Sequence, residues 1–213
     1  MSDYIRRLPV YLLLDCSGSM AGEPIEAVKQ GIKALLSELK GDPQALETAC
    51  LSVITFNSTA RQISPLTELM LFKEPALTAG GATALGGALT VLADCIRNEV
   101  RTSTPTQKGD WKPLVFLLTD GAPTDNLDDG IEALKHVSTS NIIACAAGAN
   151  ANTNTLRKIT NNVLMMNNLT AGDLAAFFAW VSGSIKASSK SIDAKPGEAI
   201  QLPPPPQGFA IVP

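Results

Sequence analysis

The chain has 213 residues, of which 45% are hydrophobic and 17% charged, and its formal net charge is −3. This length and composition suit one soluble globular domain with a sizeable core. The slightly negative charge, without any cluster of lysine or arginine, excludes a general nucleic-acid binder, and the longest apolar stretches are too short to span a bilayer.

Short β-rich runs alternate with longer helical stretches along the chain. Several of the expected strands are continuously apolar, as is typical of strands that helices cover on both faces. In chain order, we expect a strand at 9–14, a helix at 24–39, a strand at 51–56, a short edge strand at 60–64, a helix at 84–99, a strand at 114–119, a helix at 128–138, a strand at 142–147, a helix at 154–160, a strand at 163–166 and a helix at 171–184.

This alternation predicts an α/β fold with a doubly wound, mostly parallel sheet, one short antiparallel edge strand and helices on both faces. In such folds ligands bind beyond the carboxyl ends of the strands. Asp15 and Asp120 stand at two of these ends. We expect both carboxylates to lie outside the packed interior.

The composition changes after residue 188. The chain becomes polar, then reaches four consecutive prolines at 203–206 and an apolar end at 209–212. The proline run predicts polyproline II. We therefore expect a domain at 1–188 and a proline-rich tail at 189–213. The tail could be a linker, a docking peptide or a strap on the domain's own surface, and a plain tail or a strap is favoured.

The N-terminus and the cysteines favour a cytoplasmic protein. Residues 1–7 lead directly into a strand-like segment, without the apolar stretch and cleavage site of a secretory signal. The four cysteines are scattered and form no C-x-x-C pair, which disfavours structural zinc and a disulfide framework: Cys16, Cys50, Cys95 and Cys145.

Three oxygen-rich segments carry the candidate chemistry. Asp15, Ser17 and Ser19 alternate directly after the first strand, Thr83 follows a Gly-Gly turn, and Asp120 follows a buried strand. If the three segments converge, their carboxylates and hydroxyls form a hard-oxygen site suited to Mg²⁺ or Mn²⁺.

Each segment has a simpler interpretation when taken alone. Asp-x-Ser-x-Ser could cap the helix that begins near Pro24, Thr83 could be a helix N-cap, and Thr-Asp-Gly is most often a turn. Asp125, Asp128 and Asp129 could extend an acidic rim, although capping and helix-dipole roles are favoured. The joint order of the three segments, each after the right kind of element, favours the metal site.

These segments resemble the von Willebrand factor A (VWA) domain family, whose members carry a metal-ion-dependent adhesion site. The resemblance covers about residues 8–188, and Asp15, Ser17, Ser19, Thr83 and Asp120 fill all five expected positions. It implies that Ser17, Ser19 and Thr83 contact the metal directly, with Asp15 and Asp120 often acting through water.

Residues 80–86 and 119–125 are more specifically similar to the bacterial TerY-like group. That group is associated with tellurite resistance and stress response. The similarity implies kinases and phosphatases as working partners.

A shell of several neutral hydroxyls and two carboxylates leaves a divalent cation under-neutralised. Mg²⁺ also usually keeps waters, one of which a partner's Asp or Glu can displace. We therefore expect a non-enzymatic, metal-dependent protein-interaction module, with no catalytic residues.

Two other functions stay open. One is a structural scaffold regulated by phosphorylation. The other is a Mg²⁺-dependent phosphotransferase, which is disfavoured because haloacid-dehalogenase-like enzymes need a carboxylate where Ser17 stands. A serine hydrolase is weaker still, because a histidine base is required and the chain has only His136.

Overall fold

A seven-stranded sheet forms the centre of the computed structural model, which describes residues 6–148, 151–191 and 202–212. The strand order is β3-β2-β1-β4-β5-β6-β7. The strands are β1 (Leu8–Asp15), β2 (Ala49–Phe56), β3 (Ala60–Glu68), β4 (Leu114–Thr119), β5 (Asn141–Ala147), β6 (Asn162–Met166) and β7 (Phe209–Ile211). The five inner strands are parallel, and β3 pairs antiparallel with β2. The predicted fold class is confirmed, and β7 adds a second antiparallel edge strand that the sequence did not lead us to expect.

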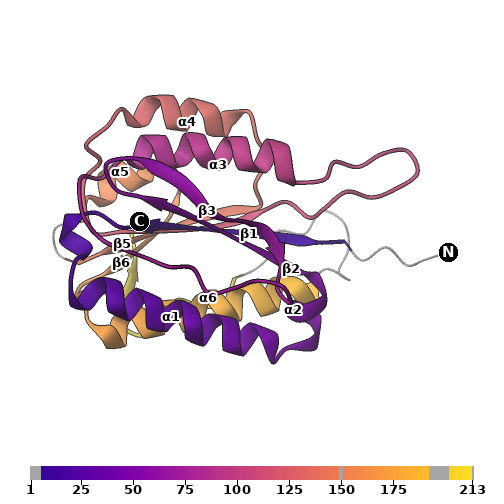
Figure 1. Cartoon of the computed structure of the whole chain (residues 1–213), viewed down its shortest axis with the longest axis horizontal. Coiled ribbons are helices and arrows are strands. Elements are labelled where there is room, and N and C mark those ends of the chain that lie inside the picture. Colours follow the sequence, from indigo (N-terminus) through magenta and orange to yellow (C-terminus); the bar gives the residue numbers. More distant parts are fainter. Residues whose placement is uncertain (1–5, 149–150, 192–201, 213) are drawn as a thin grey trace.

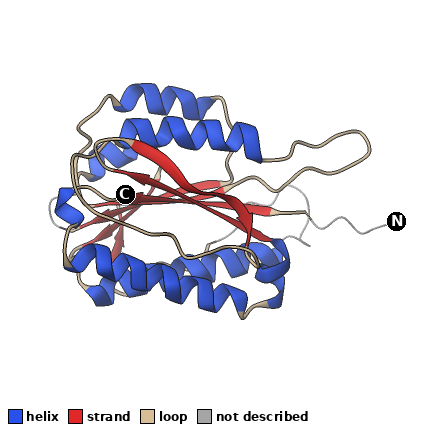
Figure 2. Ribbon diagram, in the orientation of Figure 1, coloured by secondary structure: helices blue, strands red, loops and turns tan. Residues whose placement is uncertain are grey.

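Helices cover both faces of the sheet (Figures 1 and 2). One face carries α1 (Glu23–Lys40), α2 (Pro43–Thr48) and α6 (Ala171–Ser191), and the other carries α3 (Leu85–Glu99), α4 (Leu127–Lys135) and α5 (Thr153–Arg157). Every residue of β1 is buried. Leu12 and Leu14 pack into the core beneath α1 and α6, while Tyr11 and Leu13 pack beneath α3. This burial on both faces explains why the strands read as continuous apolar runs.

Two helical features were missed in the sequence. The short α2 begins with Pro43, and the Asp42 side chain caps it by accepting a hydrogen bond from the Ala45 N–H at 3.0 Å. Helix α6 continues seven residues past the predicted end. Its polar end is buried against the domain, and the hydroxyls of Ser184 and Ser188 are satisfied there by donating to the carbonyl four residues earlier, both at 2.8 Å.

Residues 202–212 lie against the domain. Strand β7 pairs with β6, and Leu202 and Phe209 pack against the core on the α1 side of the sheet. The indole Nε1 of Trp180 donates to the carbonyl of Pro203 at 3.0 Å. Part of the predicted tail, 192–201, lies outside the described residues, and the division at residue 188 stays a prediction. No helix in the described part of the chain is long and apolar enough to cross a membrane.

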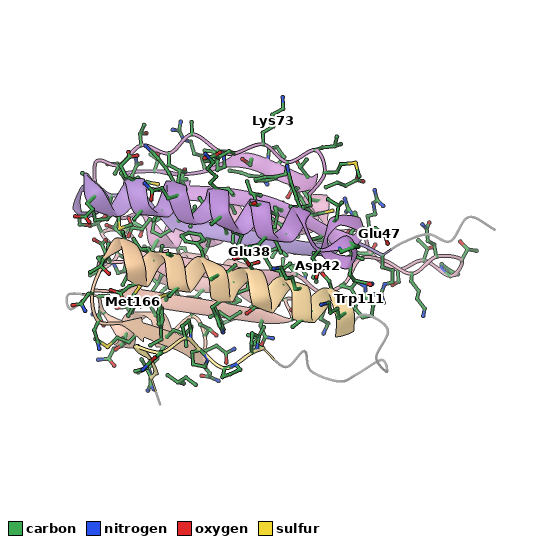
Figure 3. The ribbon with its side chains drawn as sticks, turned by 90° about the horizontal axis from the view of Figure 1, so that it is seen from below. Glu38, Asp42, Glu47, Lys73, Trp111 and Met166 are labelled. Carbon is green, nitrogen blue, oxygen red and sulfur yellow. The ribbon has the colours of Figure 1, made fainter. Side chains whose placement is uncertain are left out.

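The contact between α1 and α6, which lie side by side in Figure 3, leads to the first testable prediction. A Cβ at Gly31 would lie 2.1 Å from Cδ2 of the buried Phe178 ring. We expect Gly31→Ala to lower the free energy of unfolding by about 1–3 kcal/mol, because the two helices must separate. Urea denaturation measures this.

Gly183→Ala is the matched control, because a Cβ at this position of α6 has no atom within 4 Å. It should be neutral or stabilising, since alanine loses less backbone entropy in a helix. Equal stability of the two variants would contradict the proposed packing.

Candidate metal centre

The five candidate residues come from three loops at one edge of the sheet. Asp15 is the last residue of β1. The 3₁₀ turn η1 (Gly18–Met20) follows it; Ser17 lies directly before this turn and Ser19 lies within it. Asp120 follows β4, which is the parallel neighbour of β1, so the two carboxyl ends meet. Thr83 lies two residues before α3.

Three of these side chains form a continuous hydrogen-bonded chain. The hydroxyl oxygens of Ser17 and Ser19 are 3.0 Å apart, and the Ser19 hydroxyl donates to Oδ1 of Asp120 at 2.8 Å. The structure therefore brings together oxygens from two loops that are about one hundred residues apart in sequence.

Asp15 lies deeper than expected. Its side chain is buried, with the residue only 1% exposed, so the expectation that this carboxylate lies outside the packed interior is wrong. The reason is local bonding: Oδ1 accepts from the Ser17 N–H at 2.8 Å, and Oδ2 accepts from the Thr119 hydroxyl at 2.5 Å. Asp15 thus orients the Ser17 loop and ties it to the end of β4. Thr119 was missed as a supporting residue, although its position directly before Asp120 was a signal.

Thr83 is held in place by its backbone. Its N–H donates to the Thr124 hydroxyl at 3.1 Å, and its carbonyl accepts from the Thr124 N–H at 2.9 Å. A Cβ at Gly121 would lie 3.4 Å from the Thr83 hydroxyl oxygen, so this hydroxyl faces the loop that carries Asp120. Within the described ranges, the Thr83 hydroxyl has no hydrogen-bond partner.

The glycines before Thr83 connect its loop to the Asp15 loop. The Gly80 N–H donates to the Cys16 carbonyl, and the Gly18 N–H donates to the Gly81 carbonyl, both at 2.9 Å. Gly81 has φ +86°, and a Cβ there would lie 2.4 Å from the Ser58 hydroxyl oxygen. Glycine is therefore required at this close approach.

Thr83 is not the helix cap that one interpretation of the sequence suggested. The N-cap of α3 is Ala84, which caps without a side chain. The carboxylate of Asp125 instead accepts from the backbone N–H groups of Gly86 at 3.0 Å and Gly87 at 2.7 Å. This leaves the Thr83 hydroxyl available for another role.

The two carboxylates of the cluster are electrostatically uncompensated. Among the described residues, neither Asp15 nor Asp120 forms an ion pair with a lysine or arginine. Burial raises the pKa of Asp120, the nearby Asp15 raises it further, and the hydrogen bond from Ser19 opposes the rise. A cation bound among these oxygens would favour the charged carboxylate and reverse this shift.

The donor set fits a hard divalent cation. It consists of two carboxylates and three hydroxyls, which are oxygen ligands of the kind that Mg²⁺ and Mn²⁺ prefer. No group of three or more His, Cys, Asp or Glu side chains that could hold a metal occurs in the part of the chain described by the structure. A cation at this edge would therefore depend on the serine and threonine hydroxyls.

Fold and loop cluster together define a doubly wound α/β domain with an oxygen-rich centre at the carboxyl edge of its sheet. Comparison with known families gives the same result, since the von Willebrand factor type A domain matches residues 10–178. The chain belongs to this family, whose members are generally protein-interaction modules.

Among curated proteins, the chain is similar to the E3 ubiquitin-protein ligase WAVH1 of Arabidopsis thaliana. The two are 27% identical over 131 residues, which is 55% of this chain and 18% of the ligase. The match thus concerns a small part of that larger protein.

Solved structures share the fold at low identity. A von Willebrand factor type A protein from Catenulispora acidiphila superposes with a TM-score of 0.61 at 21% identity, over 86% of this chain and 43% of that one. The mussel byssus proximal thread matrix protein 1, with a zinc-occupied MIDAS motif, superposes with a TM-score of 0.59 at 19% identity, over 84% of this chain and 48% of that one. The pilus adhesin SpaC from Lactobacillus rhamnosus GG superposes with a TM-score of 0.68 at 14% identity, over 86% of this chain and 30% of that one.

Proposed function

We propose that this domain binds a divalent cation at the loop cluster and uses it to capture an acidic side chain of a partner protein. Ser17, Ser19 and Thr83 would contact the metal directly, and Asp15 and Asp120 would act mainly through water. The observation that carries the proposal is the chain Ser17–Ser19–Asp120 beside a second buried carboxylate, with no basic side chain among the described residues to neutralise the pair.

The charge of such a site explains why it would take an acidic partner. Two carboxylates at most neutralise a divalent ion, and the three hydroxyls add no charge. The cation, held in a partly buried loop cluster, can therefore gain from one more anionic oxygen in place of a water. Mg²⁺ or Mn²⁺ suits the oxygen donors. The zinc-occupied MIDAS motif of the mussel protein supports a divalent metal in this fold but leaves Mg²⁺ a proposal for this chain.

The finer biological placement is also a proposal. The similarity of residues 80–86 and 119–125 to the TerY-like group suggests a bacterial tellurite-resistance or stress-response system, with a kinase and a phosphatase as associated partners. The four cysteines are all free and buried, which suits a reducing cytoplasm.

An interaction module is favoured over an enzyme. The ligase activity named for WAVH1 belongs to a protein of which this chain matches 18%. His136, the only histidine, is the C-cap residue of α4 and lies 3.8 Å from Glu132, and among the described residues neither Ser17 nor Ser19 forms a hydrogen bond with it. Two alternatives remain: a phosphorylation-regulated scaffold, which predicts partner binding without metal, and a less favoured Mg²⁺-dependent phosphotransferase.

Selection from a displayed library of random peptides separates these functions. With Mg²⁺ or Mn²⁺ present, we expect the domain to retain peptides that share an Asp or Glu. Chelator should release them, and replacing that acid with its amide should abolish binding. Peptides that remain bound in chelator would contradict metal-dependent capture and favour the scaffold.

A further inference from the structure

A small polar hollow of about 20 Å³, partly open to solvent, lies next to the Asp15 loop on the α1 side of the sheet. The ends of β2 and β3 form one wall and the segment after β3 forms the other, with Thr55, Arg61, Cys16, Leu77 and Thr78 among the lining residues. Figure 1 shows this segment returning along the sheet on the α1 side. The proposed metal site does not use this hollow.

Arg61 is the only charged residue in the lining. It sits directly opposite Thr55 in the β2–β3 pairing, so the two side chains lie next to each other on the same face of the sheet. Across the described ranges, the Arg61 guanidinium forms no ion pair or side-chain hydrogen bond. Its five N–H donors are therefore available to a ligand.

Thr55 provides a second donor. The residue is 8% exposed and lines the hollow, yet its hydroxyl has no hydrogen-bond partner among the residues described. The Thr55 hydroxyl is not one of the fully buried, unpartnered side-chain atoms of the described residues, so a ligand oxygen in the hollow can reach it.

Asn57 adds a third donor at the rim. Its Oδ1 accepts from the Thr59 N–H at 3.2 Å, and its amide NH₂ group has no hydrogen-bond partner among the described residues. The carbonyl of Asn57 accepts from the Ala84 N–H at 2.7 Å, directly after Thr83. The hollow thus shares a wall with the loop that presents Thr83.

Nothing in the lining would repel an anion. No Asp or Glu lines the hollow. Cys16 lies between Asp15 and Ser17, so the hollow and the candidate metal centre occupy two sides of one loop.

We propose that this hollow is an anion-binding subsite in which Arg61, Thr55 and Asn57 hold a second carboxylate of the partner. The partner would then be an acidic segment that presents two carboxylates, one to the cation and one to Arg61. The assignment of the anion to the same partner rests on the proposed function, whereas anion binding in the hollow does not.

The first test measures anion binding without metal. In buffer with chelator, acetate is titrated into the whole chain while NMR signals of Thr55, Asn57 and the Arg61 side chain are followed. We expect saturable shifts that weaken about tenfold in Arg61→Gln, because a charge-assisted bond is lost, and by less in the isosteric Thr55→Val. Lys73→Gln makes the same charge change on an exposed side chain that projects outward in Figure 3, and it should leave the shifts unchanged.

Absence of saturable shifts, or equal shifts in Arg61→Gln and the wild type, would overturn the subsite whatever the metal does.

The second test uses a displayed library of peptides with one fixed Asp and random neighbours, in Mg²⁺. The wild type should select a second acid, and Arg61→Gln should keep the fixed Asp but lose that preference. A second acid that persists in Arg61→Gln would overturn the shared-partner assignment. Acetate binding without any metal-dependent selection would instead overturn the proposed function.

Discussion

An Asp120→Asn domain is expected to lose the rise in melting temperature that Mg²⁺ or Mn²⁺ gives the wild type. A ligand at one hundred times its dissociation constant stabilises a folded protein by about 2.7 kcal/mol, and the variant removes a charged oxygen from the proposed site. The amide oxygen can still accept the hydrogen bond of 2.8 Å from Ser19, so the loop should stay folded. Thermal denaturation with metal and with chelator measures the effect.

The same variant should be more stable than the wild type in chelator at pH 7. The pKa of Asp120 is raised in the folded state by burial and by Asp15, so the folded chain holds this proton more tightly than the unfolded chain does. Wild-type stability therefore falls as the pH rises from the unfolded pKa through the folded one, and the asparagine avoids that loss. The stability advantage of Asp120→Asn over the wild type should narrow as the pH is lowered through the pKa of Asp120 in the folded state.

Asp128→Asn is the matched control, because it removes one exposed carboxylate in the first turn of α4, outside the cluster. It should keep the full metal response. If Asp120→Asn keeps the response as well, the site assignment is wrong.

Asp110→Ala is expected to be the most destabilising single change of those considered. The Asp110 side chain is fully buried and forms a bidentate pair with Arg7, with Nε at 3.0 Å and Nη2 at 2.5 Å from its two oxygens. It also accepts from the Arg101 N–H at 2.8 Å. Removing the carboxylate leaves a mostly buried guanidinium without this partner, which costs about 3–5 kcal/mol.

Urea denaturation of Asp110→Ala should be compared with that of Asp94→Ala. The Asp94–Arg97 pair is also 2.5 Å long but more than half exposed, so its loss should cost no more than about 1 kcal/mol. Arg7 lies just before β1 begins, and the candidate metal centre lies where β1 ends. Asp110→Ala should therefore keep its response to metal, and similar destabilisation by the two variants would contradict the role given to burial.

Most elements could be predicted because their signals are local. Strands β1, β2, β4, β5 and β6 are buried on both faces, which makes them continuously apolar, and they were located to within two residues. The side chains proposed as metal ligands were also found from local order, since each follows or precedes a recognisable element. Their convergence followed from the rule that parallel strands end at the same edge.

Features that depend on distant contacts could not be predicted. Strand β7 forms only because β6 offers an edge for Phe209–Ile211, and the polar end of α6 is helical because it is buried against the domain. The helix start near Thr83 is capped by Asp125, about forty residues away.

The amino-acid sequence by itself determined the fold class and which oxygens lie at the carboxyl edge of the sheet, because hydrophobic periodicity and chain order are local properties. Only the tertiary structure decided that Asp15 is buried under Thr119, that the Thr83 hydroxyl is free of a capping role, and that Arg61 and Thr55 face one hollow. Those facts depend on which strands and loops become neighbours. Hydrogen bonds between residues far apart in the chain produce no periodic pattern in the sequence.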